Sequence, residues 1–193
     1  KIIAYENLQS ERSSSNTRSL GAADQTGPQA LATVVLTAFQ SGDYGPLTPH
    51  IHPEKGFFFL THPGAMSIPY QCEETGEMIN RAPWLGKGLE DLQTDPQLSA
   101  IPSFSCARGF SKSGCFVGPA PADYQEISSL MRDLNQVEEG MYRPETISRA
   151  RTFETLVSHQ VVDTEAAIAF FLGEVEGKWY VLVVDIATYD CSA

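Results

Sequence analysis

The sequence predicts an α+β domain in which an N-terminal helix and a second amphipathic helix pack on a curved antiparallel sheet. Two segments, residues 28–41 and 121–139, repeat apolar side chains with the period of a helix. Residues 153–188 are rich in β-branched and aromatic residues, which favour strands. We therefore expect a C-terminal three-stranded meander, preceded by an irregular middle rich in cysteine, proline and glycine.

Residues 1–27 are expected to lie outside this domain as a polar leader or tether. Residues 9–27 are dominated by serine and other polar residues, which bury too little apolar area to offset the entropy lost on ordering. The single α+β domain is therefore assigned to residues 28–193, a length that forms one core.

The first helix is predicted from Pro28 to Ser41. Proline is favoured in the first turn of a helix, and Gly42 is suited to end it. The apolar positions fall at helical spacing on one face: Leu31, Val34, Val35, Ala38 and Phe39. Glycine and proline break residues 42–49, and the run Phe57-Phe58-Phe59-Leu60 then predicts a short buried strand.

The second helix is predicted over residues 121–139. It follows residues 61–120, which show no sustained period and contain three of the four cysteines. A short helical turn is expected after Pro144. The apolar face of the second helix comprises Tyr124, Ile127, Leu130, Met131, Leu134 and Val137.

Three closing strands are predicted at residues 153–162, 166–175 and 178–188. Asp163-Thr164 and Glu176-Gly177 separate them and suit tight reversals. The last strand is apolar on both faces, which is typical of a central strand covered on both sides. Strict alternation would place Trp179, Val181, Val183 and Asp185 on one side of it.

The charge balance argues against two classes of partner. The chain has 13 Lys+Arg against 24 Asp+Glu, a formal net charge of −11 that repels phosphate backbones and anionic membrane surfaces. Nucleic acid is therefore not an expected partner. No stretch approaches the roughly 20 apolar residues of a membrane helix.

The four cysteines favour disulfides over a zinc site, because no two of them form a C-x-x-C pair. Disulfides imply a secreted or periplasmic protein, and four buried thiols in a cytosolic protein are the alternative. We expect Cys106 to pair with Cys115, because the segment between them contains two glycines and can fold back. That choice leaves Cys72 to pair with Cys191.

Three short segments carry a resemblance to a known superfamily. They are Ser41-Gly42-Asp43, His52-Pro53-Glu54-Lys55-Gly56 with the aromatic run behind it, and Gly177-Lys178-Trp179-Tyr180-Val181-Leu182. In these the chain resembles exported bacterial proteins of the nuclear-transport-factor-two-like (cystatin-like, SnoaL-like) superfamily. The resemblance implies a curved antiparallel sheet wrapped around helices to form a cone with a pocket, which some members use for catalysis and others for binding alone.

Asp185 is the main candidate for a catalytic group. A carboxyl buried on a central strand would have a raised pKa and could act as a general base. His159, on an earlier strand, is a candidate acid–base partner. The alternative is structural: Asp185 accepts hydrogen bonds from a neighbouring loop, or from Arg149 or Arg151.

His50, His52 and His62 are candidate metal ligands, because alternate strand positions place two imidazoles on one face. Prolines bracket the first pair and argue against a regular strand there, so no metal site is assigned. No cofactor is expected either. Gly86-Lys87-Gly88 lacks the upstream glycine of a phosphate-binding loop, and Ser111 lacks the glycine spacing of a nucleophile elbow.

Phe58, Tyr70 and Trp84 are candidate ligand-binding residues, because aromatic side chains near prolines can line an apolar pocket for a small molecule or peptide.

The leading functional hypothesis is an exported binding or interaction domain without a catalytic centre, whose partner is an unidentified small molecule or protein. One alternative is a small hydrolase or isomerase that uses Asp185 and His159. Another is a structural cell-envelope component, tethered by a lipid upstream of residue 1.

Overall fold

The structure, a computed structural model, describes residues 27–191. The leader expected at residues 1–27 therefore lies almost entirely outside the described residues. Within residues 27–191 the chain forms four α-helices, two 3-10 helices, a seven-stranded sheet and a separate two-stranded sheet, so the α+β class is confirmed.

The elements follow one another as α1 (Pro28–Ser41), η1 (Gly45–His50), β1 (Phe57–Thr61), β2 (Ile68–Cys72), α2 (Thr75–Arg81), η2 (Pro83–Lys87), β3 (Gln97–Leu98), β4 (Phe104–Ser105), β5 (Gly109–Phe110), β6 (Cys115–Pro119), α3 (Glu126–Val137), α4 (Pro144–Glu154), β7 (His159–Asp163), β8 (Ile168–Val175) and β9 (Lys178–Asp185). The large sheet has the order β2-β1-β9-β8-β7-β6-β3. Its pairs are antiparallel except β1 with β9 and β3 with β6, which are parallel.

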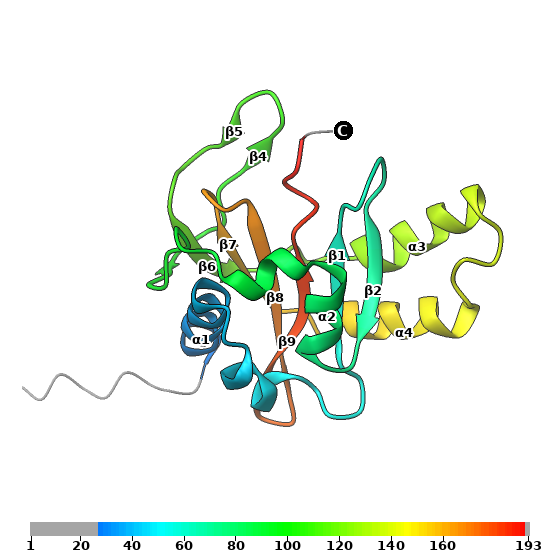
Figure 1. Cartoon of the computed structure of the whole chain (residues 1–193), viewed down its shortest axis with the longest axis horizontal. Helices are drawn as coiled ribbons and strands as arrows, with labels where there is room; N and C mark the ends of the chain where they lie inside the picture. Colours follow the sequence, from blue (N-terminus) through cyan, green and yellow to red (C-terminus); the bar gives the residue numbers. More distant parts are fainter. Residues whose placement is uncertain (1–26, 192–193) are drawn as a thin grey trace, which may run out of the picture.

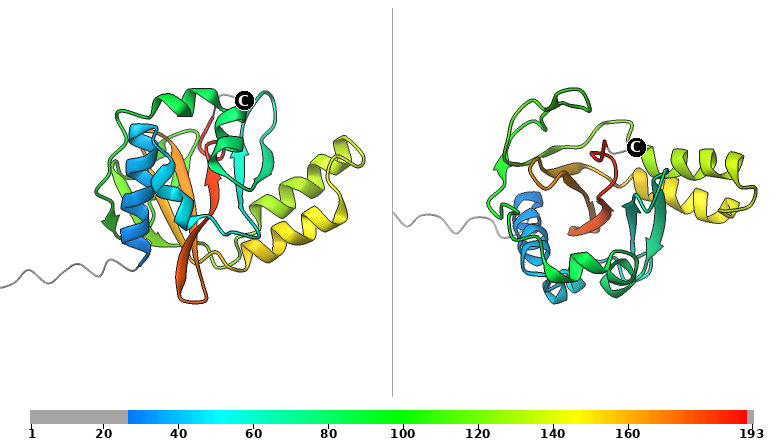
Figure 2. Two further views of the ribbon diagram at one scale, coloured as in Figure 1. Left: turned by 60° about the horizontal axis from the view of Figure 1, so that its bottom comes forward. Right: turned by 45° about the horizontal axis from the view of Figure 1, so that its top comes forward.

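Helices cover both faces of the large sheet and create two cores (Figure 1). One core joins α1, η1, α2 and η2 to one face of the sheet. The other joins α3 and α4 to the opposite face, and these two helices project from the body beside β1 and β2 (Figure 2). None of the described helices is long and apolar enough to cross a membrane.

The first helix forms as predicted, from Pro28 to Ser41. Gly42 ends it in the left-handed conformation, with φ 72°. A Cβ at this position would lie 2.9 Å from both the Gly86 oxygen and the Gly88 nitrogen, so the turn also lets the η2 segment approach closely. The buried face of α1 comprises Leu31, Ala32, Val35, Leu36, Ala38 and Phe39.

The C-terminal meander β7-β8-β9 is confirmed. Glu176 and Gly177 both have positive φ, 53° and 77°, which is the conformation of a two-residue turn matched to strand twist. The expected strand at residues 153–162 is wrong in its first half, however. The chain finishes α4 at Glu154, and β7 begins only at His159.

The two helices between β6 and β7 differ in length from expectation. The second predicted helix, at residues 121–139, is shorter: α3 runs from Glu126 to Val137. The short turn expected after Pro144 is instead the eleven-residue helix α4. Ala150 and Phe153 are buried at helical spacing, which explains why this segment is helical rather than extended.

The middle of the chain is only partly irregular. The buried strand at Phe57-Phe58-Phe59-Leu60 is confirmed as β1. Two full strands of the main sheet, β2 and β6, were not anticipated, and Pro69 is accommodated because β2 is an edge strand. The small sheet β4-β5 and two short helices make up much of the rest.

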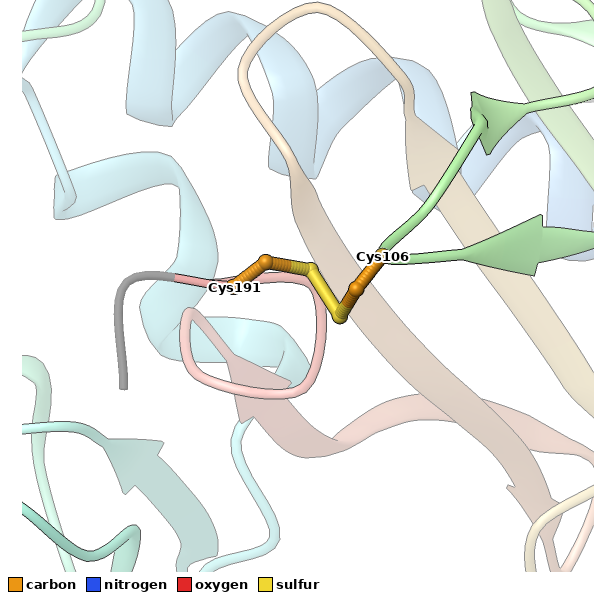
Figure 3. The surroundings of a disulfide bond; sticks show 2 residues. All are labelled: Cys106 and Cys191. Carbon is orange, nitrogen blue, oxygen red and sulfur yellow. A yellow bond between two sulfur atoms is a disulfide. The ribbon is translucent and has the colours of Figure 1, made fainter.

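The expected disulfide pairing is wrong. Cys106 bonds to Cys191, whereas Cys72 and Cys115 are buried free thiols. Figure 3 shows the bridge joining the turn between β4 and β5 to the C-terminal segment. The turn does fold back, but toward the chain end and not toward Cys115. A disulfide indicates an oxidising environment outside the cytoplasm.

Burial raises the pKa of the Cys72 thiol to about 11 and that of the Cys115 thiol to about 12. Both therefore stay protonated at neutral pH, and neither offers a thiolate.

Candidate functional site

A β-bulge decides which face of the sheet Asp185 occupies. Val183 is opposite Phe171 and Val181 is opposite Leu172, so β9 contains one extra residue, Leu182, at this point. The extra residue reverses the alternation beyond it. The expected set of Trp179, Val181, Val183 and Asp185 on one side is therefore wrong: Trp179 and Val181 face α1, whereas Val183 belongs to the core beneath α3.

Asp185 follows Val183 onto the α3 side. It is paired with Leu60 of β1 and Ala169 of β8, and both of these residues belong to the core beneath α3. Within the sheet β9 lies between β1 and β8, so it is the central strand that its composition predicts.

The Asp185 carboxyl is 1% exposed, and its two oxygens differ. Oδ1 accepts hydrogen bonds from the backbone N–H groups of Ala187 and Thr188, both at 2.9 Å. Oδ2 is buried without a hydrogen-bond partner. The backbone bonds support the structural alternative for Asp185, and the guanidinium of Arg149 donates instead to Gln71.

Asp163 provides a comparison within the same sheet. It is also fully buried at the end of a strand, but both of its oxygens are used. Oδ1 accepts from Glu165 and Ala166 at 3.0 and 2.9 Å, and Oδ2 accepts from Gln93 at 3.1 Å. Turn formation alone therefore accounts for Asp163 but leaves one oxygen of Asp185 unexplained.

The unpartnered oxygen of Asp185 is one of a group. Within residues 27–191, the buried side-chain atoms that lack a hydrogen-bond partner are Tyr124 Oη, Ser128 Oγ, Glu154 Oε2 and Asp185 Oδ2. The Ser128 backbone N–H donates to Glu154 Oε1 at 2.8 Å, which joins α3 to the end of α4. We call Tyr124, Glu126, Ser128, Glu154 and Asp185 the carboxyl cluster.

Charges of one sign dominate this cluster. Burial raises the pKa of Asp185, against the hydrogen bonds from Thr188 and Ala187. Burial also raises the pKa of Glu126, and the nearby carboxyls of Asp185 and Glu154 raise it further, whereas the Thr188 hydroxyl, which donates to Oε1 at 2.7 Å, lowers it.

The Tyr124 hydroxyl lies among all three carboxyl groups. Burial holds its pKa well above the usual range, and Glu126, Asp185 and Glu154 each raise it further. Burial therefore favours the protonated forms of Asp185 and Glu126, and a positive charge beside Glu126 would favour its ionised form.

An open cavity of about 400 Å³ lies beside the carboxyl cluster. Glu126 and Thr188 belong to its wall, as do Leu60, which pairs with Asp185, and Ala187, whose N–H donates to Asp185 Oδ1. Together the lining residues are Leu60, His62, Ser67, Glu126, Ser129, Leu130, Asp133, Ala187, Thr188 and Asp190. We call it the α3 cavity.

His62 is fixed in this wall by Ser67, whose Oγ lies 3.1 Å from His62 Nδ1. The α3 cavity therefore combines carboxyl, imidazole and hydroxyl groups with apolar surface, and it can bind a small ligand that has both a polar and an apolar part.

Asp185 and His159 do not form a site. His159 pairs with Leu172 of β8, and Leu172 pairs with Val181 of β9. Val181 is four residues before Asp185, so His159 and Asp185 are separated by more than about 10 Å along the strand direction. The ring of His159 packs against Trp179 on the α1 side of the sheet, at 5.2 Å between centroids. Burial lowers the pKa of His159.

The three other histidines are also separate. His50 Nδ1 lies 3.2 Å from the Trp179 carbonyl oxygen, and His52 accepts from the Glu54 backbone N–H at 3.2 Å. His62 lies in the α3 cavity. In the described part of the chain, no group of three or more His, Cys, Asp or Glu side chains is arranged to hold a metal ion.

The three aromatic candidates do not share a pocket. Phe58 is fully buried in the core beneath α3 and packs edge-on against Phe153. Tyr70 lies on the α1 side of the sheet under the Arg81 guanidinium, 3.9 Å from its ring centroid. Trp84 is 51% exposed. The aromatic-lined pocket expected from these residues is therefore not assembled.

Sequence reasoning identified Asp185 but missed the other members of the carboxyl cluster. One signal was present, because Ser128 occupies the buried face of α3 together with Ile127 and Met131. A polar residue at an apolar helical position is a sign of a buried polar contact.

No protein family, curated protein or solved structure matches the chain.

Proposed function

We propose that this protein is an exported binding domain that takes a small polar ligand in the α3 cavity, with Glu126 as the main recognising group. The observation that carries the proposal is the position of Glu126, which lines an open cavity and lies close enough to the buried carboxyls of Asp185 and Glu154, each with one unpartnered oxygen, for them to raise its pKa. Buried polar atoms without partners are rare in folded proteins, and a ligand or its bound waters can satisfy them.

Glu126 is the member of the cluster that can reach a ligand. It lines the α3 cavity and is only partly buried, whereas Asp185 is 1% exposed. The Thr188 hydroxyl fixes one of its oxygens at 2.7 Å and leaves the other for a ligand. This arrangement favours recognition through a defined hydrogen-bonding geometry.

Binding is favoured over catalysis by Asp185 and His159, because these two residues lie on opposite faces of the sheet. Secretion or a periplasmic location is part of the proposal and is supported by the Cys106–Cys191 disulfide. Membership of the nuclear-transport-factor-two-like superfamily, which builds pockets between sheet and helices, likewise remains a proposal that rests on the short resemblance.

The test is a titration of the ¹⁵N-labelled protein with small organic molecules of each charge type, monitored through backbone amide shifts. Amides at residues 126–133 and 187–190 should move together when a ligand binds. Glu126→Gln should abolish or strongly weaken the response. Glu138→Gln, at the exposed far end of α3, is the matched control and should leave it unchanged. Shifts confined to another part of the domain would refute the proposal.

A further inference from the structure

We propose that the ligand of the α3 cavity is an organic cation, a protonated amine or a guanidinium, which binds in exchange for a proton released by the carboxyl cluster. This inference rests on the proposed function and names its ligand class. Three observations support it: the single sign of charge, the kind of hydrogen-bonding atoms left unpartnered, and the apolar part of the cavity wall.

The first observation is electrostatic. Glu126, Glu154 and Asp185 come from α3, α4 and the end of β9, and each acts on the Tyr124 hydroxyl between them. The other titratable groups that face this region are Asp133 from α3, His62 after β1, and Tyr189 and Asp190 after β9. Most of these groups are acidic, so the region repels an anion and attracts a cation.

The second observation concerns hydrogen bonds. Asp185 Oδ2 and Glu154 Oε2 are buried without a hydrogen-bond partner. An ionised carboxyl offers acceptors only, so ionisation within the cluster calls for donors from outside it. Tyr124 Oη and Ser128 Oγ lie beside them and are also unpartnered. An ammonium group brings three donors and a guanidinium brings five, and the Glu126 oxygen that Thr188 leaves free can accept from either of them in the cavity.

The third observation separates an organic cation from a metal ion. Leu60, Leu130 and Ala187 form an apolar part of the cavity wall beside Glu126. Such surface suits the alkyl part of an amine and offers nothing to a hydrated metal ion. The described His, Cys, Asp and Glu side chains also form no group arranged to hold a metal.

Proton release follows from these contacts. Without a counter-charge, burial and the neighbouring carboxyls of Asp185 and Glu154 favour the protonated form of Glu126. A cation beside Glu126 favours its ionised form, so binding expels that proton to solvent. The affinity should then rise with pH, by up to about tenfold per pH unit while one proton is displaced.

The experiment compares three four-carbon probes of similar shape at pH 5, 6, 7 and 8: n-butylamine, n-butanol and butyrate. Amide shifts of the labelled protein give the dissociation constants. Calorimetry in phosphate and in HEPES gives the number of protons released. We expect n-butylamine to bind at the α3 cavity, more tightly at higher pH and with proton release, and the other two probes to bind at least about tenfold more weakly.

Variants separate the contributions. Glu126→Gln should weaken n-butylamine binding by about tenfold or more and remove its dependence on pH. Glu138→Gln should keep both. Amide spectra of each variant establish that the fold is retained, so that a loss of binding is not mistaken for unfolding.

The outcomes are distinguishable. If n-butanol or butyrate moves the cavity amides and n-butylamine does not, the cation assignment fails while the proposed function stands. If n-butylamine binds without proton release, or if Mg²⁺ or Ca²⁺ replaces it at the same amides, the inference is likewise overturned. If no probe of any charge type moves the cavity amides, both proposals fail.

Discussion

Removing the Cys106–Cys191 disulfide should destabilise the domain by a few kcal/mol. The bridge spans 85 residues of sequence, and the loop-entropy relation then gives about 4–5 kcal/mol of stabilisation at 25 °C. Both cysteines are exposed, so Cys106→Ser with Cys191→Ser leaves no cavity in the core. We therefore expect a loss of about 2–5 kcal/mol, the range found for native disulfides in secreted domains.

Removing the bridge should also loosen the chain at the α3 cavity. The bridge holds the chain end against the β4-β5 hairpin, where Phe104, Phe110 and Tyr189 pack ring to ring at 4.7–5.0 Å. The same segment supplies Thr188, whose backbone N–H donates to Asp185. Amide hydrogen exchange at residues 187–190 should therefore speed up when the bridge is removed.

The assay is urea unfolding at pH 7, followed by circular dichroism with and without reductant. Wild type should lose stability on reduction by the amount that the double serine variant loses without reductant. The control variant Cys72→Ala removes a free thiol and should remain sensitive to reductant. An unchanged urea midpoint on reduction, or peptide mapping that finds Cys106 bonded to Cys115, would refute the reasoning.

Three further predictions each compare two single substitutions. Asp185→Asn should stabilise the domain at pH 7, because the folded state raises the pKa of this carboxyl. At low pH the wild-type carboxyl is protonated in both the folded and the unfolded state, and the folded state loses stability as the pH rises and the carboxyl ionises. The difference in unfolding free energy between the variant and wild type, measured in urea, should therefore grow from acid to neutral pH. Asp163→Asn should instead destabilise by about 1–3 kcal/mol, because it replaces an oxygen that accepts a buried backbone bond, and equal effects of the two variants would contradict this account. Gly56→Ala should destabilise the domain by more than about 1 kcal/mol, because Gly56 has φ +66° and an added Cβ would overlap the Cys72 carbonyl. Gly64→Ala should be nearly neutral, because an added Cβ there meets nothing within 4 Å. Similar thermal midpoints for the two variants would count against the packing described. Phe58→Ala should lower the free energy of unfolding by about 3–5 kcal/mol and Trp84→Ala by less than about 0.5 kcal/mol, because only Phe58 is buried. A large loss of stability for Trp84→Ala would contradict the exposed position of this side chain.

The fold was predictable where a local pattern decides the structure. The helix from Pro28 to Ser41 has a regular apolar face and a glycine end, and the β8-β9 hairpin has the two-residue turn Glu176-Gly177. These signals act within a few residues of each other. They therefore appear in the sequence without knowledge of the tertiary structure.

The parts that were not predictable depend on distant partners. The bulge at Leu182 is defined by pairing between β8 and β9, and it moves Asp185 to the opposite face of the sheet. The disulfide joins Cys106 to a residue at the far end of the chain, so the two glycines that let the segment after Cys106 fold back did not indicate its partner. Neither feature leaves a local signature.

The candidate site was half predictable for the same reason. Asp185 is conspicuous as a carboxyl within an apolar strand, but Glu126 and Glu154 are ordinary residues in the first and last turns of helices. Only the packing of α3 and α4 on the sheet brings their carboxyls to Asp185. Grouping of charges by tertiary packing is not encoded in residue spacing.

The most direct test of the account is a ¹³C NMR titration of the Asp185 and Glu126 side-chain carboxyls, with and without n-butylamine. Without the amine, both groups should titrate above the ordinary pKa values of Asp and Glu, because burial raises the pKa of each and the neighbouring carboxyls raise that of Glu126 further. With the amine, the midpoint of Glu126 should fall. Ordinary values for both carboxyls, or midpoints that the amine leaves unchanged, would contradict the coupling between the carboxyl cluster and the α3 cavity.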